Sequence, residues 1–359
     1  MLEIYKKYSL IPVDEALRID SLPFKITVNM MLEIAYWAQN QFSYEETEKI
    51  IYKIYNAIVN DDLIRKVTDH IGSIVFNNDT KYANQYFSLL HNGNLIYPEN
   101  KKNGVLYIEI DGAAINTRIE NNNSTWKENK LCVVFNSDNI RYWHNKIDNE
   151  LNHKIYKREY TSFIGSADIF KKYVFYCALR NGLGKFEKIV LISDGAPWIR
   201  NLKEELFPEA QQILDFFHLY ENLFSFAKFY FKKNEKKYIP WVEKYKDLLK
   251  TGYHLKVIDH FSKFSQNTLD SAPVNIYKYL LNNINNIDYK SYVAKNYFIG
   301  SGAIESGNKI VLQKRLKGPG MRWNIETAQT LLTLKAKVES DLWVEDVCCQ
   351  TSQKTLWAA

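Results

Sequence analysis

Hydrophobic residues in the first hundred positions recur at the spacing of amphipathic helices. Residues 28–38 carry apolar side chains three and four positions apart, which predicts a helix with one buried face. Residues 43–46 have the S-x-x-E form of a helix start, so we expect a second helix to continue over 47–59. A third is expected over 63–75. Three short helices in tandem are compatible with a helix-turn-helix module or with a plain helical bundle.

The hydrophobic period changes after residue 100. Short apolar runs bounded by polar or glycine-containing segments are typical of buried strands, and longer amphipathic stretches lie between them. We expect strands at residues 105–110, 131–135, 188–193 and 211–214 and helices at residues 167–182 and 197–206. Strands alternating with helices at these lengths predict an α/β sheet with helices on its faces.

Beyond residue 223 the pattern is helical again and rich in lysine and aromatic residues. Within it, the asparagine-rich run 282–286 is expected to form a loop. A final helix is predicted to begin near Gly300-Ser301-Gly302, with Ser301 as its N-cap. That start places Glu305 in the first helical turn.

Composition adds little beyond a soluble character. Apolar residues make up 46% and charged residues 25% of the chain, and the formal net charge is +6. No window of about 18 uncharged apolar residues occurs, which argues against a membrane span, and the first residues lack a secretory-signal pattern. The four cysteines show no paired zinc spacing. Cys132 and Cys177 lie in apolar runs, so we expect the reduced thiols of a cytoplasmic protein.

Two predicted strands finish with the same three residues. Residues 107–113 and 190–196 each run from an apolar strand into Asp-Gly-Ala, with carboxylates at Asp111 and Asp194. A carboxylate at a strand end lies on a rigid element, at the sheet edge where α/β folds gather ligands. Either aspartate could instead start a turn or cap the next helix. The matched pair favours a shared site, because neighbouring strands would bring both carboxylates to one hard cation.

Glu305 is the third candidate acid. The dipole of the helix favours an ionised carboxylate in the first turn by about 0.3–1 kcal/mol. Residues 295–339 contain eight Lys or Arg and only three acids, a local net charge of +5, and Lys309 lies one turn beyond Glu305. A lone acid among cations suits a metal ligand beside a polyanion. The alternative is an exposed glutamate on a solvated basic face.

Several of these segments resemble a known family. Residues 300–323, from Gly-Ser-Gly to Arg-Trp, resemble the glutamate block of bacterial insertion-sequence transposases of the DDE class, most closely the ISLre-type group and its Mutator-like relatives. Residues 107–113 are similar to the first aspartate motif and 192–196 to the second. Residues 215–218 resemble the D-x-x-H signature that follows it. Residues 10–44 look like the N-terminal helical part, so the resemblance spans most of the chain.

The resemblance implies a fold and a division of the chain. The expected fold is α/β, with a ribonuclease-H-like catalytic core, a helical N-terminal domain and a helical insertion between the second and third acids. The 111 positions between Asp194 and Glu305 leave room for that insertion. We expect a helical N-terminal domain with a candidate helix-turn-helix at 1–100, the first part of the core at 101–222, the insertion at 223–297, the closing helix at 298–345 and a tail at 346–359.

The resemblance also implies a mechanism. Asp111, Asp194 and Glu305 would hold two Mg²⁺ or Mn²⁺ ions, which prefer oxygen ligands, for in-line displacement at phosphorus. Water would free a 3′-hydroxyl, which would then attack target DNA, and His218 would act near the scissile phosphate. The expected partners are the transposon terminal repeats and target DNA, bound by a homodimer or larger assembly at the nucleoid. The DNA contacts are expected from Lys232, Lys233, Lys309, Lys314, Arg315, Lys317, Arg322 and Trp323.

Other classes remain open. A phosphatase or nuclease could use the same pair of carboxylates to bind two metal ions. A haloacid-type phosphatase, however, requires a second aspartate two positions after the first, and the chain has Ala113 there. A glycosidase also uses paired carboxylates but has no need of a basic segment. A catalytically silent DNA-binding protein, a decayed or repurposed transposase, is the alternative from another class. Acids at all three positions argue against decay.

Overall fold

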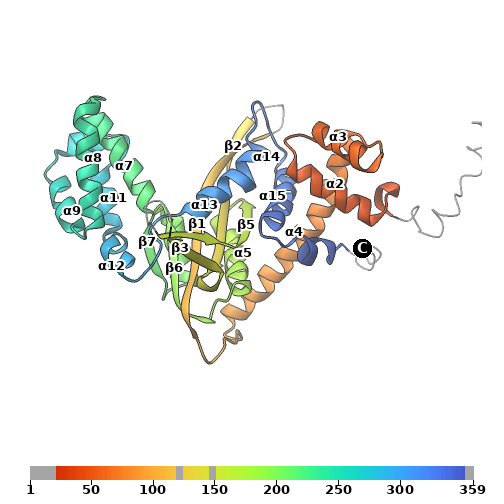
Figure 1. The fold of residues 1–359 in the computed structure, drawn as a ribbon, viewed down its shortest axis with the longest axis horizontal. Coiled ribbons are helices and arrows are strands. Elements are labelled where there is room, and N and C mark those ends of the chain that lie inside the picture. The colour runs from red at the N-terminus through yellow and green to blue at the C-terminus, as the bar shows by residue number, and fades with distance from the viewer. Residues whose placement is uncertain (1–21, 119–123, 145–150, 352–359) are drawn as a thin grey trace, which may run out of the picture.

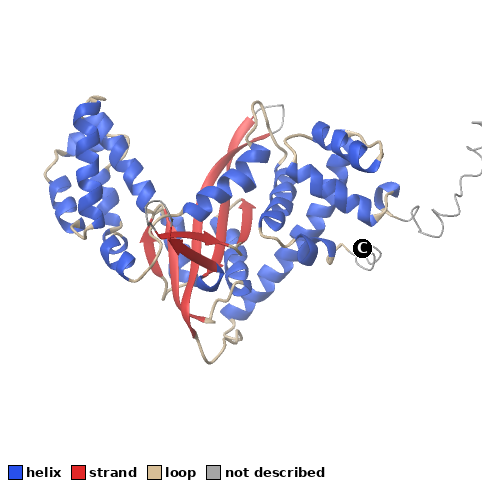
Figure 2. Cartoon of the chain, viewed as in Figure 1, coloured by secondary structure: helices blue, strands red, loops and turns tan. Residues whose placement is uncertain are grey.

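The computed structural model describes residues 22–118, 124–144 and 151–351 as a mixed α/β fold (Figures 1 and 2). The first 21 residues and residues 352–359 of the expected tail lie outside the described ranges. A five-stranded sheet lies between a helical arm and a group of N-terminal helices. None of the helices in the described ranges is long and apolar enough to cross a membrane.

The sheet has the strand order β5-β2-β1-β6-β7. Strand β2 runs antiparallel to both β1 and β5, whereas β1, β6 and β7 are mutually parallel. Parallel neighbours need crossover connections, and helices α5 and α6 supply them. The bounds are β1 Lys102–Arg118, β2 Ser124–Asn136, β5 Glu159–Ile164, α5 Ala167–Arg180, β6 Phe186–Ser193, α6 Pro197–Leu206 and β7 Gln211–Leu214.

Each face of the sheet is covered because side chains alternate along its strands. On β1, Leu106, Ile108 and Ile110 belong to one core, which they share with α5 and α6. Tyr107 points to the opposite face and belongs to a second core, built with the later helices of the chain. Cys132 and Cys177 are buried free thiols in the first of these cores, as the apolar pattern around them predicts.

The N-terminal helices are α2 Val28–Asn40, α3 Tyr44–Tyr55 and α4 Asp61–His91. The predicted start at Ser43 is confirmed. Its hydroxyl accepts a hydrogen bond from the Glu46 amide at 3.1 Å, and the Glu46 carboxylate accepts one from the Phe42 amide at 3.0 Å. The predicted third helix is too short, because α4 continues to His91 and packs along α5 and the C-terminal helix α15 (Ile325–Glu339).

The lysine-rich segment forms the arm at the left of Figure 1. Its helices are short and meet around a cluster of aromatic rings, in which Phe226, Trp241 and Phe261 contact one another. Large aromatic rings allow such a small bundle to bury enough apolar area to hold together. The helices are α7 Phe216–Tyr230, α8 Glu235–Lys250, α9 His254–Ser262, α10 Gln266–Ser271, α11 Ile276–Asn282, η5 Ile284–Asn286 and α12 Tyr289–Ala294.

The closing segment is not one helix. It comprises α13 Gly302–Gly307, the π-helical segment η6 Asn308–Gln313 and α14 Lys314–Leu316, and α15 follows after a break. Gly318, Pro319 and Gly320 lie in this break, and Gly320 has a left-handed φ of 74°. A proline flanked by glycines cannot continue a helix, so the chain turns here before α15 begins.

The structure also contains short elements that the hydrophobic pattern did not reveal. Strands β3 Ile140–His144 and β4 Leu151–Ile155 form a two-stranded hairpin separate from the main sheet. Segments η2 Pro23–Lys25, η4 Ser137–Asn139 and η7 Trp343–Cys348 complete the described elements. The hairpin escaped prediction because its strands are mostly exposed and lack the alternation of a half-buried strand.

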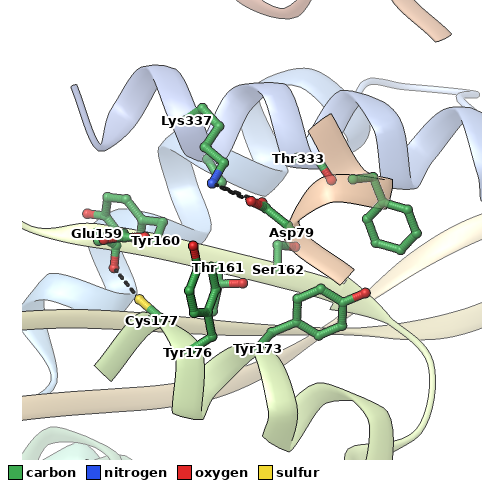
Figure 3. A pocket seen from close by; sticks show the side chains of 12 residues that line it. Asp79, Glu159, Tyr160, Thr161, Ser162, Tyr173, Tyr176, Cys177, Thr333 and Lys337 are labelled. Atoms are coloured by element: carbon green, nitrogen blue, oxygen red, sulfur yellow. Dashed lines mark hydrogen bonds and ion pairs between the residues drawn. The ribbon is translucent and has the colours of Figure 1, made fainter. Parts of the chain in front are cut away.

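A buried set of charged side chains fastens the N-terminal helices and the C-terminal segment to the sheet. Figure 3 shows three of its members, Asp79, Glu159 and Lys337. Lys337 contacts Asp79 at 2.9 Å and Asp346 at 2.8 Å. Arg180 contacts the same Asp346 at 2.8 Å and Glu159 at 3.0 Å. These pairs join α15, α4, η7, α5 and β5, and three of their members, Asp79, Glu159 and Lys337, line a cavity of about 20 Å³. Lys337 is therefore not part of a solvated basic face.

Candidate functional site

The parallel register of β1 and β6 brings the two predicted aspartates together. Ile110 pairs with Ser193, so Asp111 and Asp194 occupy equivalent positions immediately beyond that pair. The expectation that Asp111 ends its strand is wrong, since β1 continues through it to Arg118 and pairs there with β2. The strand continues because its antiparallel neighbour is longer than β6, and only the pairing with β6 stops near Asp111.

A cavity of about 190 Å³ opens at this point. Five carboxylates and one histidine face it, and they come from β1, the end of β6, the start of α7 and the start of α13. Segments more than a hundred positions apart therefore converge on one acidic pocket. The lining residues are Ile110, Asp111, Asp194, Asp215, His218, Glu221, Ser301 and Glu305.

Both aspartates are held by nearby groups. Asp111 accepts hydrogen bonds from its neighbour Gly112 at 2.8 Å and from the side-chain amide of Asn308 at 2.6 Å. Burial, and then the negative charge of Asp194, raise the pKa of Asp111 above its ordinary value. One oxygen of Asp194 accepts from the Ala196 amide at 2.9 Å. Asp194 therefore takes part in a turn, and it also lines the acidic pocket together with Asp111.

The D-x-x-H segment is tied to the Gly-Ser-Gly segment by a buried aspartate. Asp215 accepts from the Phe217 amide at 3.0 Å, which caps α7, and from the Ser301 amide at 3.3 Å. The Ser301 hydroxyl also donates to Asp215. The expectation that the Ser301 side chain caps its own helix is therefore wrong, because its hydroxyl serves Asp215 instead. This link fixes α13 against the start of α7.

Glu109 is a further acid that the motif search passed over. It is 1% exposed and lies two positions before Asp111 on the same face of β1. Its carboxylate accepts a hydrogen bond from the Ile304 amide in the first turn of α13 at 2.8 Å. Burial raises the pKa of Glu109 to about 8. A charged residue inside the apolar run 105–110 was the sequence signal for it.

Glu305 is the most exposed of the three predicted acids. It lies in the first turn of α13, as the sequence predicts. Partial burial raises the pKa of its carboxyl, the negative charge of Asp215 raises it further, and Lys309 opposes both. An exposed glutamate has rotameric freedom, so its carboxylate can approach the two aspartates when a cation enters.

Helix α7 contributes two side chains to the pocket. His218 lies in its first turn, and its charge, when protonated, lowers the pKa of the neighbouring Asp111. Glu221 lies one turn later, on the same side of the helix, and lines the cavity as well. The sequence pattern gave no reason to select Glu221. It is the only acid of α7, but an exposed acid on a helix is ordinary.

Four of the predicted DNA-contacting residues around Glu305 are exposed: Lys309, Lys314, Lys317 and Arg322. The interpretation of Arg315 is wrong. Arg315 is 3% exposed, and it donates to the backbone carbonyls of Ala38 and Phe42 at 3.0 Å each. Its guanidinium fastens α14 to the end of α2. Arg315 is therefore a structural residue, as is the buried Lys335, which contacts Glu339.

Trp323 is largely committed to packing. Its indole N–H donates to the Leu316 carbonyl at 3.0 Å, and the Arg315 guanidinium lies 5.0 Å from its ring. Its backbone also extends the edge of β1 through hydrogen bonds with Asn116 and Arg118. Base stacking by Trp323 would use only the part of the ring left exposed.

Lys232 and Lys233 lie at the far end of α7, where the chain turns into α8. Both are exposed and have left-handed φ angles, 50° and 62°. Residues other than glycine rarely adopt this backbone conformation, so the turn is held by the contacts of the residues around it. The two lysines lie on the arm just past the end of α7, whereas the acidic pocket is lined by residues at the start of that helix.

The donor set of the pocket matches the preferences of hard divalent cations. Its carboxylate oxygens suit Mg²⁺ or Mn²⁺ better than zinc, and the side-chain oxygen of Asn308, buried beside Asp111, has no hydrogen-bond partner. Among the residues that the structure describes, no three His, Cys, Asp or Glu side chains already converge as a metal site does. The residues fit such an ion chemically.

Comparison with known proteins places the chain in a family. The model of the Uncharacterised protein family (UPF0236) matches residues 89–337, which is more than half of the sequence, so the chain belongs to this family. The match begins at the end of α4 and covers the sheet, the arm, the acidic pocket and nearly all of α15. No curated protein matches the sequence.

Proposed function

We propose that this member of the UPF0236 family is a DDE transposase, which cleaves and transfers DNA strands at the ends of its insertion sequence. The observation that carries the proposal is the β1–β6 register, which places Asp111 and Asp194 side by side at a pocket that Glu305 also lines. Three acids from different elements, facing one cavity, are an arrangement suited to two-metal phosphoryl transfer.

The sheet supports a ribonuclease-H-like interpretation of the core. Numbered within the sheet alone, its strands follow the order 3-2-1-4-5, with the second antiparallel to the first and the last two parallel to it. The first and second acids lie on the central pair, and the third lies on a helix after the last strand. The arm falls between the second and third acids, where the resemblance predicts an insertion.

In this proposal Asp111, Asp194 and Glu305 hold divalent cations. When bound, two such ions supply stabilisation of the attacking and leaving oxygens during in-line displacement at phosphorus. The raised pKa values of Asp111 and Glu305 reflect burial and mutual repulsion among the acids, and a cation would relieve this repulsion. Glu109 and Asp215 hold α13 in place through Ile304 and Ser301, which keeps Glu305 within reach of the pocket.

The remaining residues of the site have roles in handling the substrate. His218 faces the same cavity as the three acids, where it can donate a hydrogen bond to a phosphate oxygen or accept a proton from the attacking water. Exposed cations on η6 and α14 and in the segment that follows α14 provide phosphate contacts beside the pocket. Lys232 and Lys233 on the arm extend the basic surface. The proposed contact set is Lys309, Lys314, Lys317, Arg322, Lys232 and Lys233.

The proposal is tested with purified protein and labelled DNA from the flanks of its own gene, in Mg²⁺ or in EDTA. We expect nicking at a defined end that requires the metal and is abolished in Asp194→Asn, because the amide removes one anionic ligand. DNA binding by this variant should stay near the wild-type level. Asp168→Asn, whose side chain is 90% exposed on α5, is the matched control and should cut normally.

The alternative outcome separates two interpretations of the chain. Wild-type-like cutting by Asp194→Asn would remove Asp194 from the mechanism. Binding without cutting by the wild-type protein would favour the catalytically silent DNA-binding alternative, which needs the basic surface but not the acids.

A further inference from the structure

The β3–β4 hairpin is a ribbon whose two faces differ. Residues paired across antiparallel strands share a face. Arg141 pairs with Lys154, and both therefore lie on one face, here called the outer face. Tyr142 pairs with His153 on the other, the inner face. Trp143 lies two positions after Arg141 and belongs to the outer face.

The inner face attaches the ribbon to the surroundings of the acidic pocket. The His153 ring lies 4.6 Å from the ring of Phe298, which in turn lies 4.9 Å from the ring of Tyr107. Tyr107 precedes Asp111 by four positions on the same face of β1, on the order of 13 Å along the strand. Phe298 is three residues before Ser301, which contacts Asp215. The ribbon is thus packed on Phe298, in the segment that leads to α13.

The outer face presents aromatic rings between cations. Trp143 is 46% exposed, and Tyr156, just after β4, is 54% exposed. The Arg141 guanidinium lies 4.6 Å from the Tyr156 ring and the Lys154 ammonium 5.2 Å from it. Residues 140–144 and 151–158 contain four Lys or Arg and no Asp or Glu. An exposed surface of this kind has the charge of a polyanion site and the flat rings of a stacking platform.

We infer that the outer face of the β3–β4 ribbon binds unpaired DNA next to the position that is cut. This inference rests on the proposed function for its choice of DNA as the polyanion. Aromatic rings stack on the faces of bases, which are accessible in single strands and hidden in an intact duplex. Arg141 and Lys154 lie where they can contact the flanking phosphates.

The experiment measures binding of a labelled oligothymidylate to the full chain in EDTA, where cleavage is not required. We expect Trp143→Ala and Tyr156→Ala each to weaken binding roughly tenfold, since each removes one stacking contact. Arg141→Ala and Lys154→Ala should each reduce the slope of log affinity against log salt by about 0.7, the value for one phosphate contact to a single strand.

The controls separate stacking from loss of folding. Trp143→Phe keeps an aromatic ring and should retain most of the binding. Tyr82, which is 41% exposed on α4, and Lys188, which is exposed on β6, provide the matched Tyr82→Ala and Lys188→Ala substitutions. Neither should change affinity or salt slope. Thermal unfolding of every variant checks that the exposed substitutions leave the fold intact.

The binding measurement tests the ribbon, and the cleavage measurement tests the proposed function, so the two can fail separately. Ribbon-dependent binding without metal-dependent cutting would support the inference and remove the proposed function. Cutting by a protein whose ribbon variants bind oligothymidylate like the wild type would retain the proposed function and overturn the inference. The inference also fails if wild-type protein does not bind the oligonucleotide, prefers the matching duplex, or is displaced more readily by RNA of the same length.

Discussion

At the scale of single residues, the acids of the pocket depend on a neutral neighbour. Asn308 is buried and donates a hydrogen bond to Asp111 at 2.6 Å. It lies at the first position of the π-helical segment η6, and such a segment often re-aims a side chain at a functional site. We expect Asn308→Ala to raise the Mg²⁺ concentration needed for half-maximal cleavage by about 10–100-fold, because groups that orient metal ligands have effects of this size.

Gln313, exposed at the other end of the same segment, provides the control substitution Gln313→Ala. Its Mg²⁺ dependence should match that of the wild type. An Asn308→Ala variant with an unchanged Mg²⁺ titration would show that Asp111 needs no help from Asn308. The measurement is a metal titration of cleavage at saturating DNA.

The individual acids differed in how well the sequence predicted them. Asp111 and Asp194 follow similar apolar runs, and parallel strands bring such positions together, so their proximity followed from the pattern. Glu109 did not stand out, because its burial depends on an amide at Ile304, nearly two hundred positions later. Arg315 was misassigned for a similar reason, since its partners Ala38 and Phe42 lie in a distant helix and loop.

At the scale of elements, α13 depends on a close approach to the sheet. A Cβ atom built on Gly307 would lie 2.5 Å from the ring of Tyr160, which is only 2% exposed. A Cβ atom on Gly302, in the same helix, would meet nothing within 4 Å. We expect Gly307→Ala to lower the free energy of unfolding by about 1–3 kcal/mol through overpacking, and to impair cleavage by displacing Glu305.

Gly302→Ala is the matched control, and its effect should have the opposite sign. Alanine is favoured over glycine in a helix by roughly 0.5–1 kcal/mol, and nothing obstructs it at this position. Chemical denaturation of both variants gives the comparison. Equal stability of the two would show that Tyr160 can move aside and that the contact with the sheet is looser than the structure indicates.

The sequence predicted most of the elements with a strong hydrophobic period, although it missed strand β5, whose buried residues alternate. Helix α6 and strand β7 have the bounds expected from the pattern, because buried strands and amphipathic helices have distinct periods. The β3–β4 hairpin, which is mostly exposed, has no such signal. The extension of α4 to His91 was missed because its second half is stabilised by packing against α5, which local pattern does not record.

At the scale of the whole molecule, charged pairs reinforce contacts that the hydrophobic cores already make between distant parts of the chain. Lys337 on α15 bridges Asp79 of α4 and Asp346 of η7, and Arg180 of α5 also contacts Asp346. Lys337 and Arg180 both contact Asp346. Removing this one acid therefore takes a partner from two cations that are largely buried. Such a loss costs more than an exposed ion pair contributes.

Asp346 is the member whose removal gives the clearest test. Burial raises the pKa of Asp346, but the charges of Lys337 and Arg180 lower it by more. The pKa of this carboxyl therefore lies below the ordinary value of 3.8. The folded state therefore binds this proton less readily than the unfolded chain, so the pair stabilises the fold above about pH 4 and the stabilisation is lost as pH falls through the folded-state pKa. We expect Asp346→Asn to cost about 3–5 kcal/mol near neutral pH.

The difference between wild type and Asp346→Asn should shrink as pH falls below about 4, because the protonated aspartic acid then resembles the amide. Glu345, exposed beside it on η7, provides the control: Glu345→Gln should stay within about 0.5 kcal/mol of the wild type at every pH. Urea denaturation across this pH range measures both. A cost that is the same at about pH 7 and about pH 3 would mean that the amide substitution acts through shape rather than charge, and that α4, η7 and the sheet are held together by packing alone.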